Sequence, residues 1–99
     1  MAKRKVNGDK DFLFECILSL ETVEECYDFF EDLCTPREVE EMSKRIRAAR
    51  MLAENSVYTE VVNETGLSTA TISRVNRCLK EGSDGYATVL SRVKKDESL

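Results

Sequence analysis

The sequence contains no histidine and no tryptophan, and it has only one proline and four glycines among its 99 residues. Without histidine it lacks the side chain that most often acts as a general base or a metal ligand. It also has no nucleophile elbow and no phosphate-binding glycine loop. The scarcity of helix breakers, together with abundant Glu, Lys, Arg, Leu and Ala, favours helix. The sequence therefore predicts an all-α protein that has no catalytic residues and is not an enzyme.

The cysteines show no spacing typical of a metal site. They are Cys16, Cys26, Cys34 and Cys78, and no two of them form a C-x-x-C pair. A zinc site would have to draw all four ligands from three separated segments. We therefore expect no metal site, and we expect small, mostly buried thiols in a reducing cytoplasm.

Export and membrane signals are missing as well. The basic start Met-Ala-Lys-Arg-Lys is followed by charged residues at 9–11 instead of an apolar segment, so it does not resemble a signal peptide. No apolar run approaches the ~20 residues that a membrane span requires. These features predict a soluble, cytoplasmic protein.

The formal net charge of −4 argues against binding to nucleic acid, because attraction to phosphate supplies most non-specific affinity for DNA. The charge is unevenly distributed, however. Residues 9–34 include nine acidic residues and one basic residue, whereas residues 65–80 include three basic residues and no acidic one. Residues 1–8 and 35–53 are net basic. The local field of the C-terminal half can therefore be positive although the total charge is negative.

A chain of this length has room for one domain. We expect a flexible basic arm at 1–8, a single helical domain at 9–95 and a frayed tail at 96–99. Apolar residues within 12–20 occupy more than one helical face: Phe12, Leu13, Phe14, Cys16, Ile17, Leu18 and Leu20. A helix that is apolar nearly all round must be buried on several sides. In so small a chain, the second partner is expected to be another subunit.

Capping signals and apolar spacing predict where the later helices lie. Thr22 and Thr35 are each followed three residues later by glutamate, which is the pattern of a capping box. Helices are expected at 22–33, 36–53, 58–64, 69–81 and 86–93. In the helix at 36–53, the residues expected to face inward are Val39, Met42, Ile46, Ala49 and Ala53. Gly82 is expected to end the fourth as a C′ glycine.

The segment 58–81 carries the motif that is most informative for function. Val61 precedes Gly66 by five positions, and Gly66 can adopt the positive φ that the turn of a helix-turn-helix needs. Leu67 follows the turn, and Ser68 can cap the second helix. The inward stripe of that helix is formed by Ile72, Val75 and Leu79. Together these positions predict a helix-turn-helix.

The opposite face of the second helix suits DNA. Its residues are small or carry hydroxyl groups near its start, where a recognition helix approaches base edges, and they are basic further along. The residues expected to contact DNA are Ser68, Thr69, Ala70, Thr71, Ser73, Arg74 and Arg77. Arg45, Arg47, Lys80 and the basic arm are expected to hold phosphates. The sequence therefore predicts a regulator of transcription that binds specific sequences in double-stranded DNA.

A different class of function stays open on the residues alone. A helix-turn-helix also serves as a packing motif or a protein contact, and the acidic total favours such a protein-interaction module without DNA binding. The run Arg45, Arg47 and Arg50 is equally compatible with an ordinary solvated helix face. The acidic segment 22–34 is interpreted as a solvated exterior.

Two stretches resemble the Trp repressor superfamily, and within it the YerC/YecD branch of small Trp-repressor-like proteins. One runs from Leu33 through Thr35-Pro36-Arg37-Glu38 to Arg45-Ile46-Arg47, and the other runs from Ser68 to Arg74 and ends at Leu79-Lys80. The resemblance covers roughly residues 10–95. It implies an intertwined, all-helical homodimer that acts as a repressor-like regulator. Each subunit would present a helix-turn-helix to successive major grooves, roughly 34 Å apart as in helix-turn-helix dimers generally.

The same resemblance implies where an effector would bind. The Trp repressor uses tryptophan as corepressor, and motif matching places Thr35, Arg45 and Arg74 at the ligand. Two guanidinium groups suit a carboxylate chemically. Val75, however, stands where the repressor has a glycine that leaves room for the indole, and valine adds three carbons to that wall. We therefore expect no cofactor, and tryptophan in particular is not expected to bind.

Overall fold

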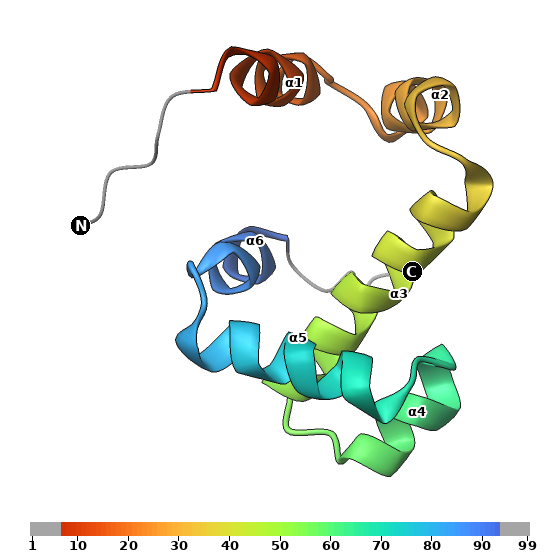
Figure 1. Ribbon diagram of the computed structural model, residues 1–99, viewed down its shortest axis with the longest axis vertical. Coiled ribbons are helices and arrows are strands. Elements are labelled where there is room, and N and C mark those ends of the chain that lie inside the picture. The colour runs from red at the N-terminus through yellow and green to blue at the C-terminus, as the bar shows by residue number, and fades with distance from the viewer. Residues whose placement is uncertain (1–6, 94–99) are drawn as a thin grey trace. The chain divides into compact units, whose positions relative to one another are not determined.

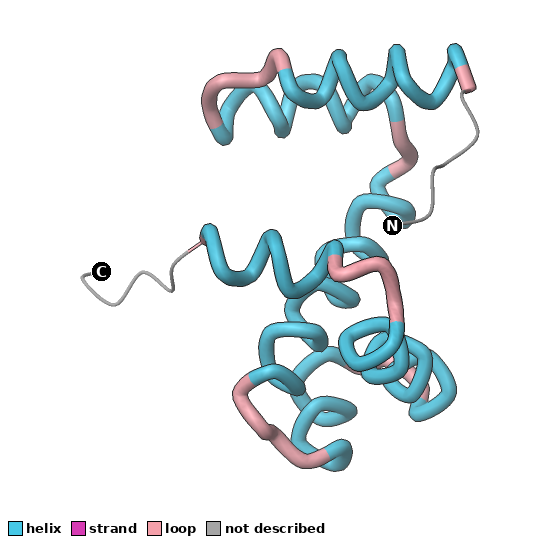
Figure 2. The backbone as a smooth tube through the Cα atoms, turned by 90° about the vertical axis from the view of Figure 1, so that its left-hand side faces the viewer, coloured by secondary structure: helices cyan, strands magenta, loops and turns pink. Residues whose placement is uncertain are grey.

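The computed structural model describes residues 7–93, which form six helices and no strand (Figure 1). The helices are α1 Gly8–Leu18, α2 Val23–Leu33, α3 Pro36–Ala53, α4 Tyr58–Thr65, α5 Thr69–Glu81 and α6 Gly85–Arg92. Over these residues the backbone consists of helices joined by short loops (Figure 2), which confirms the all-α prediction. The chain divides into two compact units, Met1–Val39 and Glu40–Leu99.

The N-terminal unit leaves large apolar side chains in contact with water. Its helices α1 and α2 contain no buried residue. The exposed apolar residues are Phe12, Phe14, Leu18, Val23, Tyr27 and Leu33. Leu18 is 83% exposed and Phe12 is 67% exposed. Exposed apolar surface is unfavourable in water, and large patches of it mark interaction sites. The two helices α1 and α2 therefore carry a candidate interaction surface.

Hydrogen-bonded caps fix where α3 and α2 begin. Thr35 Oγ1 accepts from the amide of Glu38 at 3.2 Å, and Glu38 Oε1 accepts from the amide of Thr35 at 2.8 Å, which forms the predicted capping box. The Thr35 amide, helped by its hydroxyl, lowers the pKa of Glu38. At α2, Thr22 Oγ1 accepts from the amide of Glu25 as predicted. The Glu25 carboxylate, however, accepts from the amide of Glu21 at 2.9 Å, so this second box is shifted by one residue.

The C-terminal unit has a core of small and aliphatic side chains contributed by α3, α4, the turn and α5. Its buried residues are Ala48, Ala49, Val61, Thr65, Leu67, Ile72 and Val75. Val61, Leu67, Ile72 and Val75 confirm the predicted inward pattern of the helix-turn-helix, whereas Leu79, predicted to face inward as well, is half-buried. The prediction for α3 is wrong in part, since Ala48 is fully buried whereas Met42 and Ile46 are each 37% exposed. Ala53, also predicted to face inward, is exposed. The small side chains of Ala48 and Ala49 allow α3 to pack closely against the core. The longer side chains of Met42 and Ile46 then lie beside this contact and stay partly exposed.

The turn between α4 and α5 has the predicted left-handed residue. Gly66 adopts φ +75° and ψ +6°, and its amide donates to the carbonyl oxygen of Val62 at 2.8 Å. An added Cβ at Gly66 would meet no atom within 4 Å. Any penalty for a side chain at this position is therefore backbone strain and not a clash.

Replacing Gly66 with valine is expected to destabilise the fold. A left-handed backbone costs an ordinary residue about 1–2 kcal/mol, and a β-branched residue suffers more. Chemical denaturation should give the highest free energy of unfolding for wild type, a lower value for Gly66→Ala and the lowest value for Gly66→Val. Gly85→Ala is the matched control, because a Cβ there also meets open space and Gly85 has no positive φ. A Gly66→Val protein that unfolds like wild type would place the turn elsewhere.

Two local predictions need correction. Gly82 ends α5, but its φ is −84° and not left-handed. Glycine suits this position because a Cβ would press on the backbone of Cys78, 3.0 Å from its Cα. All four cysteines are free thiols, yet Cys26 is exposed and the other three are half-buried. The prediction of mostly buried thiols is wrong because the helices that carry them are only partly covered.

The ends of the described segment bear on the predicted domain limits. Asn7 caps α1 by accepting from the amide of Lys10 at 3.0 Å, and Gly8 is the first residue of this helix. The helix therefore begins inside the segment 1–8 that is predicted as an arm. The remainder of that arm and the tail at 96–99 lie outside the described residues. Within residues 7–93, no helix is long and apolar enough to span a bilayer, and no cluster of three ligand-type side chains is placed to hold a metal.

Candidate nucleic-acid interface

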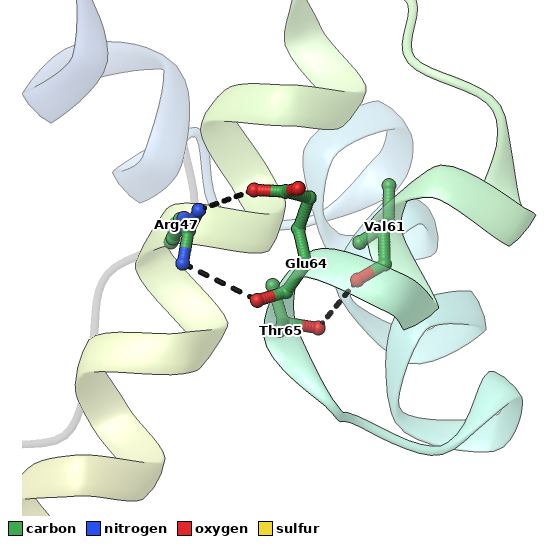
Figure 3. A network of polar contacts seen from close by, with 4 residues as sticks. All are labelled: Arg47, Val61, Glu64 and Thr65. Atoms are coloured by element: carbon green, nitrogen blue, oxygen red, sulfur yellow. Dashed lines mark hydrogen bonds and ion pairs between the residues drawn. The ribbon is translucent and has the colours of Figure 1, made fainter.

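The junction between α4 and α5 is held by a buried threonine. Thr65, the last residue of α4, donates its hydroxyl to the carbonyl oxygen of Val61 at 2.7 Å (Figure 3). The Thr65 hydroxyl also accepts from the amide of Leu67 at 3.2 Å. Leu67 is 5% exposed and belongs to the core between the helices. These contacts, together with the left-handed Gly66, fix the direction in which α5 leaves the turn.

The start of α5 presents small polar side chains to the surface. Ser68 Oγ accepts from the amide of Thr71 at 3.2 Å, which confirms the predicted cap. The residues predicted to contact DNA that are exposed are Ser68, Thr69, Ala70, Ser73, Arg74, Arg77 and Lys80. Thr71 differs, because its side chain is half-buried, pairs with Ser68 Oγ at 3.1 Å and lines a cavity.

The surface of α5 has a positive field. Arg74 and Arg77 form no ion pair with another described residue. No acidic residue lies between Gly66 and Lys80. The positive end of the helix dipole adds to the field at the start of the helix. An anion such as a phosphate would therefore meet cations that are not already neutralised.

The two predicted phosphate-holding arginines of α3 have different surroundings. Arg45 is half-buried and lines the cavity beside α5. Arg47 instead binds the end of α4, where its Nη2 lies 2.6 Å from Glu64 Oε1 and its Nη1 donates to the Glu64 carbonyl oxygen at 3.3 Å (Figure 3). The sequence gives no sign of this pair, because the two residues are 17 positions apart.

A cavity of about 430 Å³ lies within the C-terminal unit. It is lined by Met42, Arg45, Ile46, Thr71, Arg74, Val75, Cys78 and Tyr86. Three of the four predicted effector residues, Arg45, Arg74 and Val75, are thus brought together. Thr35 lies in the N-terminal unit, where its hydroxyl caps α3. Val75 is 2% exposed, so it forms a wall of the cavity and does not project into solvent.

Sequence reasoning missed the other lining residues. Met42 and Ile46, predicted from their spacing of four to face inward, line the cavity together with Arg45, but the spacing alone does not assign them to a ligand site. Tyr86 comes from α6, which contacts α5 after a loop in which Asp84 has φ +65°. That loop conformation is not readable from residue spacing, so the position of Tyr86 was beyond prediction.

The helix α5 follows a left-handed glycine turn, packs its inner face on the core and leaves its outer face exposed. This arrangement defines an all-helical protein of the helix-turn-helix class. The family profile described as "Trp repressor protein" matches residues 9–94, and the chain belongs to this family. The family is one of regulators and not of enzymes. This assignment confirms the predicted superfamily.

Relatives agree with the family assignment. The Bacillus subtilis protein named "Uncharacterized protein YerC" is 53% identical over 95 residues, which cover 95% of this chain and 91% of that protein. A crystal structure from Staphylococcus aureus, described as a candidate Trp repressor, has a TM-score of 0.84 and 46% identity over 88% of this chain and 87% of that one. A Trp-repressor-like protein from Eubacterium eligens also has a TM-score of 0.84, with 47% identity over 90% of this chain and 95% of that one. The YerC branch predicted from the motifs is thereby confirmed.

Proposed function

We propose that this protein is a cytoplasmic regulator of transcription that binds specific double-stranded DNA sequences as a homodimer. The observation that carries the proposal is the start of α5, where exposed Ser68, Thr69 and Ala70 precede exposed Arg74 and Arg77. The hydrogen bonds of the buried Thr65 orient this helix. Membership of a regulator family supports the same conclusion.

The side chains of α5 divide into two roles. Short side chains at Thr69, Ala70 and Ser73 allow the helix to enter a major groove, where hydroxyl groups and methyl groups can meet base edges. Arg74 reaches guanine edges or phosphates from the next turn, and Arg77 and Lys80 hold phosphates further along. Arg45 lies beside Arg74 at the cavity and adds positive charge to this surface.

The N-terminal unit supports dimerisation. Phe12, Leu18 and Val23 are each more than 60% exposed in the isolated chain, and a second copy that covers them would remove this apolar surface from water. Two recognition helices in one dimer also explain how a modest helix-turn-helix reaches useful affinity. Sedimentation equilibrium should give twice the 11.3 kDa chain mass, whereas the mass of one chain at micromolar concentration would contradict the dimer.

The cavity allows a test of the effector prediction. Its volume of about 430 Å³ lies inside the range of roughly 300–1,000 Å³ common for ligand pockets. The cavity therefore stays open although Val75 takes up space that a glycine would leave free. We propose that DNA binding does not depend on tryptophan, because Val75 occupies the wall against which an indole ring would pack. Isothermal titration with tryptophan should give no heat of binding, and a saturable heat would contradict this proposal.

Selection from a pool of random duplexes tests the proposed function most broadly. We expect the bound fraction to converge on an inverted repeat whose half-sites are roughly one helical turn apart, as two-fold symmetry requires. A triple variant of Thr69, Ser73 and Arg74 to alanine is the control and should enrich nothing. If wild type also enriches no sequence and is not retained on heparin at low salt, the helix-turn-helix is a scaffold for protein contacts, which is the alternative function.

A further inference from the structure

We propose that Arg47 is a positioning residue that ties α3 to the end of α4 and thereby holds the recognition helix in its DNA-binding orientation, without contacting phosphate itself. The inference rests on the proposed DNA binding and assigns Arg47 a role other than the phosphate contact that its position in a basic run suggests. It begins with two contacts from one guanidinium to one residue, Glu64.

The guanidinium holds both the side chain and the backbone of Glu64. Arg47 Nη2 lies 2.6 Å from Glu64 Oε1, and Nη1 donates to the Glu64 carbonyl oxygen at 3.3 Å. That carbonyl belongs to the last turn of α4, where backbone carbonyls have no partner within the helix. A cation at this end of a helix is also favoured by the dipole. The contact is therefore a C-terminal cap supplied by a different helix.

This cap lies next to the residues that set the turn. Thr65 follows Glu64 directly, is 5% exposed, and donates its hydroxyl to the carbonyl oxygen of Val61 (Figure 3). The same hydroxyl accepts from the amide of Leu67. Gly66 comes next and turns left-handed. A shift of the Glu64 backbone would move Thr65 and, through its hydrogen bonds, the start of α5. Arg47 thus acts on α5 through the turn.

The base of the Arg47 side chain is itself firmly placed. Ala48 and Ala49 follow it directly in α3 and are both fully buried in the core. The other ion pair of α3, between Lys44 and Glu40 at 3.2 Å, stays within the helix and links nothing else. Arg47 is therefore a cation of α3 that reaches from a fixed backbone to another element.

A direct phosphate contact by Arg47 would disfavour this arrangement. The guanidinium would be shared between Glu64 and the phosphate, and the Glu64 carboxylate would then lie beside a phosphate of like charge. Both side chains are about half exposed, at 49% and 52%, so the ion pair alone adds little to stability. We expect the ion pair to act mainly by fixing the position at which α4 ends.

Salt-dependent DNA titrations of matched variants separate the two roles. Arg47→Ala is expected to weaken binding roughly three- to tenfold while the slope of log affinity against log salt stays unchanged. Loss of a phosphate contact would instead lower that slope by about 1. Lys44→Ala is the matched control, since it removes a cation of α3 whose ion pair lies within the helix. It should leave affinity nearly unchanged.

The two possible roles of Arg47 predict opposite changes in DNA affinity when the Glu64 side chain is removed. If Arg47 positions the turn, Glu64→Ala weakens DNA binding although it deletes a negative charge. If Arg47 is a phosphate contact restrained by Glu64, the same change frees it and tightens binding. Glu60→Ala is the control for the loss of an acidic residue from α4. Binding tighter than that of Glu60→Ala, or a salt slope reduced in Arg47→Ala, would overturn the proposal.

Hydrogen exchange tests the positioning separately from DNA binding. The Leu67 amide bonds to Thr65 Oγ1, and its exchange is expected to rise about tenfold in Arg47→Ala and Glu64→Ala but not in Lys44→Ala or Glu60→Ala. If wild type binds no DNA while these rates rise, the proposed function fails and the positioning role stands. If the rates do not change, the positioning role fails whatever the protein binds.

Discussion

Replacing Ile72 with alanine is expected to lower the free energy of unfolding by about 2–5 kcal/mol, the range for large-to-small changes in a packed core. Ile72 is fully buried and lies among Ala48, Val61 and Leu67. Removing three carbons there leaves a cavity that the helices around it can only partly fill. Because small domains are stabilised by about 5–15 kcal/mol in total, the loss is a large share of the stability of this unit. Urea denaturation followed by circular dichroism measures it.

The matched control for this change is Ile46→Ala. The same atoms are removed, but Ile46 is 37% exposed and borders the cavity, so its loss should be less than half as large. The comparison must be made at one protein concentration, because the proposed dimer would make apparent stability concentration-dependent. Equal losses for the two variants would mean that α3, α4 and α5 do not share the described core.

Replacing Arg74 with alanine is expected to weaken DNA binding by about 1–3 kcal/mol, which corresponds to roughly 5- to 150-fold in affinity. Arg74 is exposed on α5, forms no ion pair with another described residue, and lies in a segment without acidic residues. Its charge is therefore available to a phosphate or a guanine. Fluorescence anisotropy with a selected duplex measures the change, and an unchanged melting temperature shows that the fold is intact.

Arg92→Ala controls for the loss of one positive charge. Arg92 is an exposed cation in the last turn of α6, away from the start of α5 in sequence. Its removal should change affinity by no more than about twofold, the small effect expected of a distant exposed charge in salt. If Arg74→Ala and Arg92→Ala weaken binding equally, or Arg74→Ala has no effect, Arg74 is not at the interface.

Much of the fold could be predicted because its decisive signals are local. A threonine followed by glutamate three residues later fixes the start of α3, since both partners of the capping box lie within one turn. Gly66 fixes the turn because the left-handed backbone there is costly for other residues. Ile72 and Val75 follow the helical period and point to the core. Each of these features depends on neighbours within a few positions.

What could not be predicted depends on how helices approach one another. Ala48 is buried whereas Met42 is partly exposed, because α3 packs closely against the core at Ala48. Periodicity alone does not resolve which of the two residues faces the core. The ion pair between Arg47 and Glu64 joins residues 17 positions apart. The sequence alone therefore does not show that the arginines of α3 lie in two different environments. Thr71 illustrates the same limit, because it lies on α5 among the proposed DNA contacts but lines the cavity. The register of one helix against another decides each case.

A fluorescence-anisotropy titration of genomic duplex fragments at two salt concentrations, with and without tryptophan, tests the central claim most directly. Neutralised phosphates release counterions, so affinity should fall steeply as salt rises, and tryptophan should leave it unchanged. Binding only in the presence of tryptophan would contradict the interpretation of Val75. Affinity that does not vary with salt, or no binding at either concentration, would contradict the proposal that α5 is a DNA-recognition helix.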